Sequence, residues 1–377
     1  MGIIISKLDF SQNIGKQDEW HLKDLNLGKL NLLVGRNAVG KTRTLNVISS
    51  FTKMISGKVP KLTDGNFKVS FQGGTAPRKY ILEIQQGKVV KELLTERGET
   101  LLRRSGSEGA IWHLIEGQKE KHVFYPPEEK LTYQVRRDMK QLPYLEEMAT
   151  WAEKFRIFRY SHIMPHELSI VAAPIGLTED ILVAENLSTV PHLLDRIQGQ
   201  TSIRKEILKD LAEVGYATTE LNVVSTLIHG APAPVSLIQE KEDGVPFYIP
   251  QTAFSEGMYR TIAIVIVMNY LVAAGTGATV AIDDVGGGLD FERSTRLTKI
   301  LFEKAEKSNI QLIATSNDRF LMNAVNLKYW NVLERQGTMV YSFNYRNSKR
   351  IFDRFMRLGL NNFDFFASEL YKDKHNE

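Results

Sequence analysis

Eight residues, Gly35 to Thr42, constrain the fold of this chain more than any other part of its sequence. They read GRNAVGKT, fit the pattern G-x-x-x-x-G-K-[ST], and lie between an apolar stretch (29–34) and a predicted helix (41–54). In a strand–turn–helix of this kind, successive backbone N–H groups converge on a phosphate at the positive end of the helix. The pattern therefore predicts a nucleotide site, in which Lys41 reaches the phosphates and the Thr42 hydroxyl binds Mg²⁺.

The composition is that of a folded, soluble protein. Of 377 residues, 43% are hydrophobic and 24% charged, which excludes disorder as the main state. The length exceeds that of one ordinary domain, so we expect a large domain with an insertion, or two domains. The net charge of +4 is too small to indicate nucleic acid by itself. The chain has no cysteine, which excludes disulfides and cysteine-ligated metals and fits a cytoplasmic location.

The order of predicted elements is typical of an α/β fold with a split core. Short strands are expected at 2–10, 22–27 and 29–34, as an N-terminal β part. A second block predicts helix 256–273, strand 278–282, helix 294–306 and strand 310–314. Strands that alternate with helices favour a mostly parallel sheet.

The intervening segment differs in pattern. Residues 58–135 show short alternating stretches separated by glycines, which predict an antiparallel meander, and residues 142–158 and 182–212 have helical periodicity. We therefore divide the chain into a core (1–57 and 251–345), a mixed meander and helical insertion (58–250), and a basic, aromatic tail (346–377).

Two carboxylates end the predicted strand 278–282. One carboxylate at such a strand end, Asp283, is placed to orient Mg²⁺, and the next, Asp284, to activate an attacking water. Two aspartates after a strand are weak evidence alone, but the phosphate loop makes them a strong signal.

Three further motifs flank this strand. Ser255-Glu256-Gly257 opens the preceding helix, Gly288-Leu289-Asp290 follows the aspartates, and Asn317 follows the next strand. Each has an ordinary structural explanation, as a helix cap, a turn or a loop residue. No single motif is therefore diagnostic, and it is the order of all of them along the chain that points to a function.

With its motifs in this order, the sequence resembles the ABC-type P-loop ATPase heads of the SMC, RecF and OLD group, and most of all the compact bacterial AAA-family ATPases related to OLD proteins. That family's loop has the form G-x-N-x-x-G-K-[ST], matched here at Asn37. Its signature S-x-G is matched by Ser255 and Gly257, and its D-loop by Leu289 and Asp290. Two positions depart from the family, since Asp284 stands for the usual glutamate base and Asn317 for the usual histidine. We expect slow ATP hydrolysis from both changes.

The resemblance implies that two copies bind two ATP molecules head-to-tail, each between one copy's phosphate loop and the other's signature. It implies catalytic roles for Asp284, Lys41 and Asn317, and Mg²⁺ ligands at Thr42 and Asp283. The implied ATP contacts are Gly35, Arg36, Asn37, Ala38, Val39, Gly40, Lys41, Thr42, Ser255, Glu256, Gly257 and Asp290.

The resemblance also implies a function in bacterial anti-phage defence, through control of a DNA-acting or toxic effector. OLD nucleases continue into a metal-binding Toprim domain, for which the residues after the last expected strand (338–343) leave no room, so we expect a separately encoded effector. Two alternatives stay open: a non-hydrolysing nucleotide sensor that sequesters a partner protein, and a RecF-like DNA repair clamp. A transporter's ATPase subunit is disfavoured, because the chain has a long insertion and shows no sign of membrane coupling. The longest apolar run, 261–274, is short for a membrane span.

Several basic residues and histidines are candidates for further sites. In the tail, a basic face and interleaved aromatics favour a docked helix with a solvated side over direct DNA contact. Candidate phosphate-backbone contacts are Arg103-Arg104 and Arg136-Arg137. The histidines of the insertion are scattered and predict no metal site; they are His113, His122, His162, His166 and His192.

Overall fold

The computed structural model describes residues 2–115, 118–159, 191, 194–195, 197–228, 231–242 and 245–372. The chain forms two compact units. Unit 1 comprises Met1–Phe155, Gly277–Thr279 and Asn326–Glu377, and unit 2 comprises Arg156–Thr276 and Val280–Val325. These units divide the chain at other places than the motifs do, and the motif-based division into core, insertion and tail stays a prediction.

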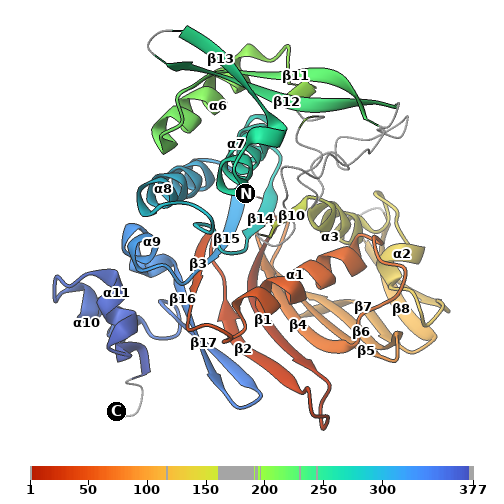
Figure 1. Ribbon diagram of the computed structural model, residues 1–377. Coiled ribbons are helices and arrows are strands. Elements are labelled where there is room, and N and C mark those ends of the chain that lie inside the picture. The colour runs from red at the N-terminus through yellow and green to blue at the C-terminus, as the bar shows by residue number, and fades with distance from the viewer. Residues whose placement is uncertain are drawn as a thin grey trace. The chain divides into compact units, whose positions relative to one another are not determined.

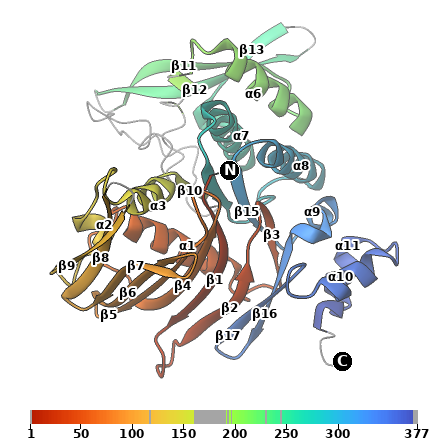
Figure 2. The same cartoon turned by 180° about the vertical axis from the view of Figure 1, so that it is seen from behind.

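Unit 1 is built on a mixed sheet (Figures 1 and 2). Its strands follow the order β3 (Leu30–Val34), β16 (Trp330–Gln336), β17 (Met339–Asn344), β2 (Trp20–Asn26), β1 (Ile4–Gln12), β4 (Gly65–Gln72), β5 (Arg78–Gln85), β6 (Lys88–Glu96), β7 (Glu99–Ser105), β8 (Glu108–Ile115) and β9 (Gln118–Phe124).

The pairing in this sheet corrects one expectation and confirms another. The parallel pairs are β3–β16 and β17–β2, whereas β1–β2, β1–β4 and β16–β17 are antiparallel, so the sheet is mixed rather than mostly parallel. From β4 to β9 each strand pairs with the next in antiparallel register, as the expected meander requires. Tight turns join these strands, and hairpins can only be antiparallel.

Helix α1 (Lys41–Ile55) covers one face of this sheet through an aromatic cluster (Figure 1). The Phe51 ring lies 5.7 Å from that of Phe67 on β4 and 5.9 Å from that of Tyr80 on β5, measured between centroids. Helices α2 (Thr132–Val135) and α3 (Pro143–Glu153) follow the meander. On α3, Trp151 donates from Nε1 to Thr279 Oγ1 at 3.0 Å.

A buried ion pair closes the core of the meander. Arg104 and Glu92 have fully buried side chains, and Arg104 Nη1 lies 3.4 Å from Glu92 Oε2. The guanidinium also donates to the carbonyl oxygens of Gly106, Pro127 and Lys130, each at 2.7 Å. Arg104 is therefore neutralised inside the protein, and the expectation that it contacts a phosphate backbone is wrong.

The tail is docked on unit 1, as its aromatic residues led us to expect. It contains helices α10 (Lys349–Met356) and α11 (Asn362–Ala367) and the short helix η5 (Leu370–Lys372). Phe352, Phe355, Phe365 and Tyr371 are all at most 2% exposed. Packing inside the chain accounts for these rings without a partner.

Unit 2 contains a helical layer and a separate sheet. Helices α6 (Thr201–Val214), α7 (Glu256–Ala274) and α8 (Phe291–Lys307) pack side by side (Figure 1). Asp210 on α6 accepts from Asn269 Nδ2 on α7 at 2.5 Å and lies 3.0 Å from Lys304 Nζ on α8. Burial raises the pKa of the Asp210 carboxyl, and the bonds from Asn269 and Lys304 oppose this shift.

The separate sheet of unit 2 was not anticipated. It is antiparallel in the order β11 (Thr218–Ile228), β12 (Ala231–Glu242) and β13 (Val245–Pro250), so β13 is an edge strand. Phe247 and Tyr248 on β13 are exposed, and Pro246 and Pro250 interrupt its backbone donors.

Two helix predictions need correction. The helix expected over 142–158 ends at Glu153, and residues 155–158 form the buried strand β10 (Phe155–Phe158). A short run of buried residues has the same appearance in a strand as in a buried helix, which explains the error. A helix is also expected over 182–212, but within this range α6 begins only at Thr201. Residues 182–190 lie outside the described residues.

Helix α7 is apolar enough to meet a length and composition test for a membrane span, with a mean hydropathy of 1.5 over 18 residues. It is the one such helix among the described residues. However, 72% of that window is buried inside the structure, and core helices of soluble proteins meet the same test. We therefore interpret α7 as a core helix.

Candidate functional site

The phosphate loop connects β3 to α1 in unit 1. Three of its residues adopt backbone conformations with positive φ, +159° at Gly35, +59° at Ala38 and +113° at Gly40. Gly35 is required for close approach, because a Cβ there would lie 2.9 Å from the Leu333 carbonyl oxygen. The local backbone conformation and close packing thus explain why glycine occupies both ends of the pattern, at positions 35 and 40.

The N-terminus of α1 is suited to an anion. The N-cap residue of this helix is Gly40, which has no side chain to cap it, and the first turn holds no acidic residue. Lys41 lies at this end and donates from Nζ to the carbonyl oxygens of Gly35, at 2.7 Å, and Arg36, at 3.2 Å. The ammonium is therefore held over the loop, while the Arg36, Asn37, Ala38 and Thr42 positions are exposed.

The docked tail contacts this loop. Arg36 Nη2 forms an ion pair with Glu369, which is also bonded to Lys372 Nζ at 2.8 Å. Lys372 in turn lies 2.8 Å from Glu334 Oε1 on β16. The tail residue nearest the loop is thus acidic, which weighs against the tail as a DNA contact at this place.

The acidic turn lies in unit 2, after β14 (Ala278–Ile282) and beside β15 (Ile310–Ser316). The Thr315 hydroxyl donates to Asp283 Oδ1 at 2.8 Å and accepts from the Asp284 N–H at 2.8 Å. The Asp284 backbone has φ +52°, a strained value for a residue with a side chain. One threonine thus links both carboxylate-bearing residues to the next strand.

The signature residues begin α7 in the same unit. Ser255 caps the helix, since its hydroxyl accepts from the Met258 N–H at 3.2 Å, and Glu256 follows in the first turn. A Cβ on Gly257 would lie 2.3 Å from the carbonyl oxygen of Gly288. The structure therefore brings the signature turn into backbone contact with the turn that precedes Asp290.

The remaining predicted residues flank these two turns. Asp290 caps α8, accepting from the Arg293 N–H at 2.9 Å, so α8 begins three residues before the predicted start at 294. Asn317 is exposed and follows β15 directly, ahead of α9 (Arg319–Ala324). Unit 1 thus holds the phosphate loop, and unit 2 holds the acidic turn, the signature, Asp290 and Asn317.

Sequence reasoning missed Arg260, which lies one turn after the signature. It is 3% exposed and bonds the backbone of the acidic turn. A signal was present, because Arg260 is the one charged residue in the apolar stretch 257–274.

Of the other basic candidates one is paired with carboxylates, and for the two exposed ones a contact with a phosphate backbone stays a prediction. Arg137 is paired with Glu146 and Glu153, and Arg103 and Arg136 are exposed single charges. In the described part of the chain no group of three or more His, Asp or Glu could hold a metal ion. His162, His166 and His192 lie outside the described residues.

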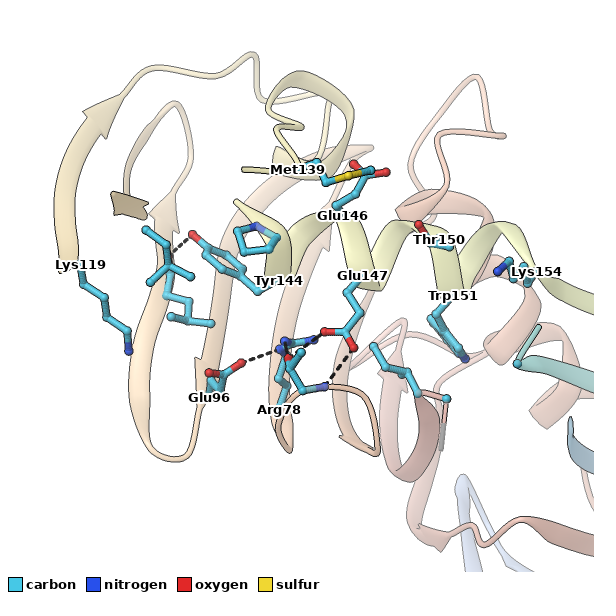
Figure 3. Close-up of a pocket in the computed structure, with 17 residues that line it drawn as sticks. Arg78, Glu96, Lys119, Met139, Tyr144, Glu146, Glu147, Thr150, Trp151 and Lys154 are labelled. Carbon is cyan, nitrogen blue, oxygen red and sulfur yellow. Dashed lines mark hydrogen bonds and ion pairs between the residues drawn. The ribbon is translucent and has the colours of Figure 1, made fainter. Parts of the chain in front are cut away.

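A cavity of about 650 Å³ lies elsewhere in unit 1, and none of the predicted site residues lines it (Figure 3). On its wall the buried Arg78 is held by Glu96, at 2.9 Å from Nε, and by Glu147, at 2.7 Å from Nη1. Tyr144 donates to the Trp112 carbonyl oxygen at 2.7 Å, and burial raises the pKa of its hydroxyl. The charge of Arg78 is thus neutralised by Glu96 and Glu147 in the cavity wall.

Comparison with protein families yields one match. The AAA_21 family, described as "AAA domain, putative AbiEii toxin, Type IV TA system", matches residues 30–323. This range includes every candidate site residue named above. Among curated proteins no sequence matches.

Similar solved structures include three SMC heads. The SMC head bound to the C-winged helix domain of ScpA is 10% identical, with a TM-score of 0.47, over 92% of this chain and 99% of that one. The SMC head domain from Thermotoga maritima is 11% identical, with a TM-score of 0.42, over 91% and 98%. The Smc head with an extended coiled coil, bound to the C-terminal domain of ScpA derived from Pyrococcus furiosus, is 10% identical, with a TM-score of 0.47, over 94% and 100%.

Proposed function

Because the chain belongs to the AAA_21 family of P-loop ATPase domains, we propose that it binds ATP at residues 35–42, hydrolyses it slowly, and controls a partner protein through this cycle. The geometry of the phosphate loop carries the proposal. A helix N-terminus with a glycine at the N-cap, a loop with positive φ at Gly40 and an ammonium over the loop are what a chain of phosphates requires.

In this proposal Lys41 exchanges its bonds to the loop carbonyls for bonds to the β- and γ-phosphates of ATP. Hydrogen bonds to charged groups contribute about 1.5–3 kcal/mol each, so this one side chain decides much of the affinity. The donor set also fits Mg²⁺, since Thr42 offers a hydroxyl and Asp283 a carboxylate that Thr315 orients. Mg²⁺ would screen the phosphate charge.

Asp284 is the proposed general base. Its carboxylate would take a proton from the water that attacks the γ-phosphate, and Asn317 would hydrogen-bond a phosphate oxygen. Aspartate reaches one methylene less far than glutamate, and asparagine carries no charge. We therefore expect turnover below about 10 s⁻¹, a typical enzyme value.

We also propose an ATP-dependent, head-to-tail homodimer. Ser255 and the N–H groups at the start of α7 would meet the γ-phosphate bound to a second copy. The family description, with its toxin and type IV TA system, supports a separately encoded partner protein. The cytoplasmic location and the role in phage defence are part of the proposal. The partner is a nuclease or toxin in this proposal, and direct DNA contact is secondary.

A second function, nucleotide sensing without hydrolysis, is favoured by Asp284 and Asn317 alone. In that case ATP would stabilise a scaffold that holds its partner protein until the nucleotide changes. Measured turnover separates the two functions.

The first experiment compares wild type, Lys41→Ala and Lys53→Ala for ATP–Mg²⁺ binding by calorimetry and for phosphate release. Lys53 is on the last turn of the same helix and serves as the matched control. We expect Lys41→Ala to weaken binding by about 10- to 100-fold or more, and Lys53→Ala to leave it unchanged. Equal affinity in all three proteins would contradict the site. Binding without any phosphate release would favour the sensor.

A further inference from the structure

Arg260 is the unusual residue of α7. It lies in the second turn of a helix that has no other charged residue from Gly257 to Ala274, and it is 3% exposed. A buried guanidinium is costly unless strong hydrogen bonds replace its hydration. The hydrogen bonds of the Arg260 guanidinium therefore indicate the role of this residue.

Those bonds go to the backbone of the acidic turn. Arg260 Nη2 donates to the carbonyl oxygens of Asp283, at 2.5 Å, and Asp284, at 2.7 Å. Nη1 donates to the carbonyl oxygen of Gly287 at 3.2 Å. One rigid, planar group thus fixes three carbonyl oxygens within five residues.

The N–H groups of the same turn are fixed from other elements. The Asp283 N–H donates to the Phe158 carbonyl oxygen at 2.8 Å, and the Val285 N–H to the Thr315 carbonyl oxygen at 3.0 Å. The Asp284 N–H donates to the Thr315 hydroxyl. Strand backbones therefore hold one side of the turn, and Arg260 holds the other.

Asp284 needs this support. A positive φ on a residue with a side chain costs of order 1–3 kcal/mol and persists only where its surroundings determine it. The φ and ψ of a residue also set the direction of its Cα–Cβ bond. When the carbonyl oxygens lose their donors, the turn can relax, and the carboxylate then points elsewhere.

We propose that Arg260 is a positioning residue for the reaction: it holds Asp284 in the strained conformation that directs the carboxylate at the attacking water. This inference rests on the proposed hydrolysis, and it adds a residue outside the recognised motifs. Arg260 itself contacts no substrate. Its loss slows hydrolysis and leaves ATP binding intact, because Lys41 and the phosphate loop belong to the other unit.

Arg104 supplies a matched control. It too is a buried arginine with bonds to three carbonyl oxygens, but it lies in the meander of unit 1. Replacing either arginine removes bonds to three carbonyl oxygens, and replacing Arg104 also removes its ion pair with Glu92. Only Arg260 touches the acidic turn.

The experiment measures single-turnover phosphate release and ATP affinity for Arg260→Gln, Arg260→Lys, Arg104→Gln and Arg104→Lys, with urea unfolding to confirm that each is folded. We expect Arg260→Gln to slow the chemical step by about 10- to 100-fold, since a misplacement of about 1 Å can cost 100-fold. Arg260→Lys retains part of the rate, because an ammonium can reach one or two of the carbonyl oxygens. All variants bind ATP with the affinity of wild type, and the Arg104 variants keep its rate.

Three results overturn the proposal: Arg260 variants as fast as the Arg104 variants, a lysine variant as slow as the glutamine variant, or a loss confined to ATP affinity. If Arg260→Gln fails to fold, the comparison of Arg260→Lys with Arg104→Lys decides. Failure of the proposed function is recognisable separately. A wild-type protein that binds ATP and releases no phosphate removes both claims, whereas an active wild type with unaffected Arg260 variants removes only this one.

Discussion

At the scale of single residues, the structure separates arginines by what neutralises them. Arg78 and Arg104 have buried side chains next to carboxylates, while the buried guanidinium of Arg260 donates to backbone carbonyl oxygens of the acidic turn. The sequence alone does not reveal these partners. Their partners distinguish them: Arg78 and Arg104 form buried ion pairs, whereas Arg260 holds the backbone of the acidic turn.

Histidine protonation is expected to make unit 1 sensitive to acid. His113 on β8 and His122 on β9 stack with ring centroids 4.2 Å apart, and burial, followed by the neighbouring His122 charge, lowers the pKa of His113. The unfolded chain then binds more protons than the folded chain near and below pH of about 6.5, so stability falls as the pH falls through this range.

We expect the urea midpoint of the wild type to drop between about pH 7.5 and about pH 5.5, and the drop to be smaller in His122→Gln, which lacks the repelling charge. Urea unfolding at the two pH values measures both. An identical drop in the two proteins would show that the pair has no part in it.

At the scale of elements, the signature helix depends on a glycine. In Gly257→Ala the new Cβ would meet the Gly288 carbonyl oxygen at 2.3 Å, so the α7 start and the turn before Asp290 must separate. We expect a loss of about 1–3 kcal/mol in unfolding free energy, as for other overpacked sites.

Gly199→Ala is the control for this substitution, since a Cβ there meets nothing within 4 Å. Its unfolding free energy should stay within about 0.5 kcal/mol of wild type. Urea unfolding of both variants is the measurement, and equal stability would mean that the turn yields without cost.

Elements with strong local signals were predicted well. Strand β14 has the bounds expected, 278–282, and α1 and α7 each end within one residue of the prediction. A glycine loop, an apolar period and a capping serine specify these elements locally. Strand β10 and the sheet β11–β13 were missed, because their residues show no period that distinguishes a strand from its alternatives.

Prediction of the candidate site from the sequence is limited in the same way, to features that are local in the chain. Phosphate loop, acidic turn and signature are contiguous motifs, so the sequence reveals them. Arg260 could not be assigned, because its partners lie 23 and more residues further along the chain. Its contact with the turn depends on how α7 packs, which no local pattern records.

At the scale of the whole molecule, we expect ATP to control assembly. In Asp284→Asn the phosphate loop and signature are intact but the proposed base is lost, so ATP-bound dimers should persist instead of dissociating. Mass photometry with and without ATP–Mg²⁺ measures this, with Lys41→Ala as the variant that stays monomeric. Asp284→Asn protein that is monomeric in ATP would contradict both the base and the dimer.

Strand β13 has a consequence for how the molecule behaves in concentrated solution. Residues 246, 248 and 250 share one side of this edge strand, and prolines occupy two of these three positions. A proline is tolerated in a sheet where its missing N–H faces away from the neighbouring strand, so the open edge retains a single such donor in this stretch, at Tyr248. An edge this poor in donors is a weak template for another strand. Unit 2 therefore displays the rings of Phe247 and Tyr248 to solvent on a strand that offers few backbone donors to a strand of another molecule.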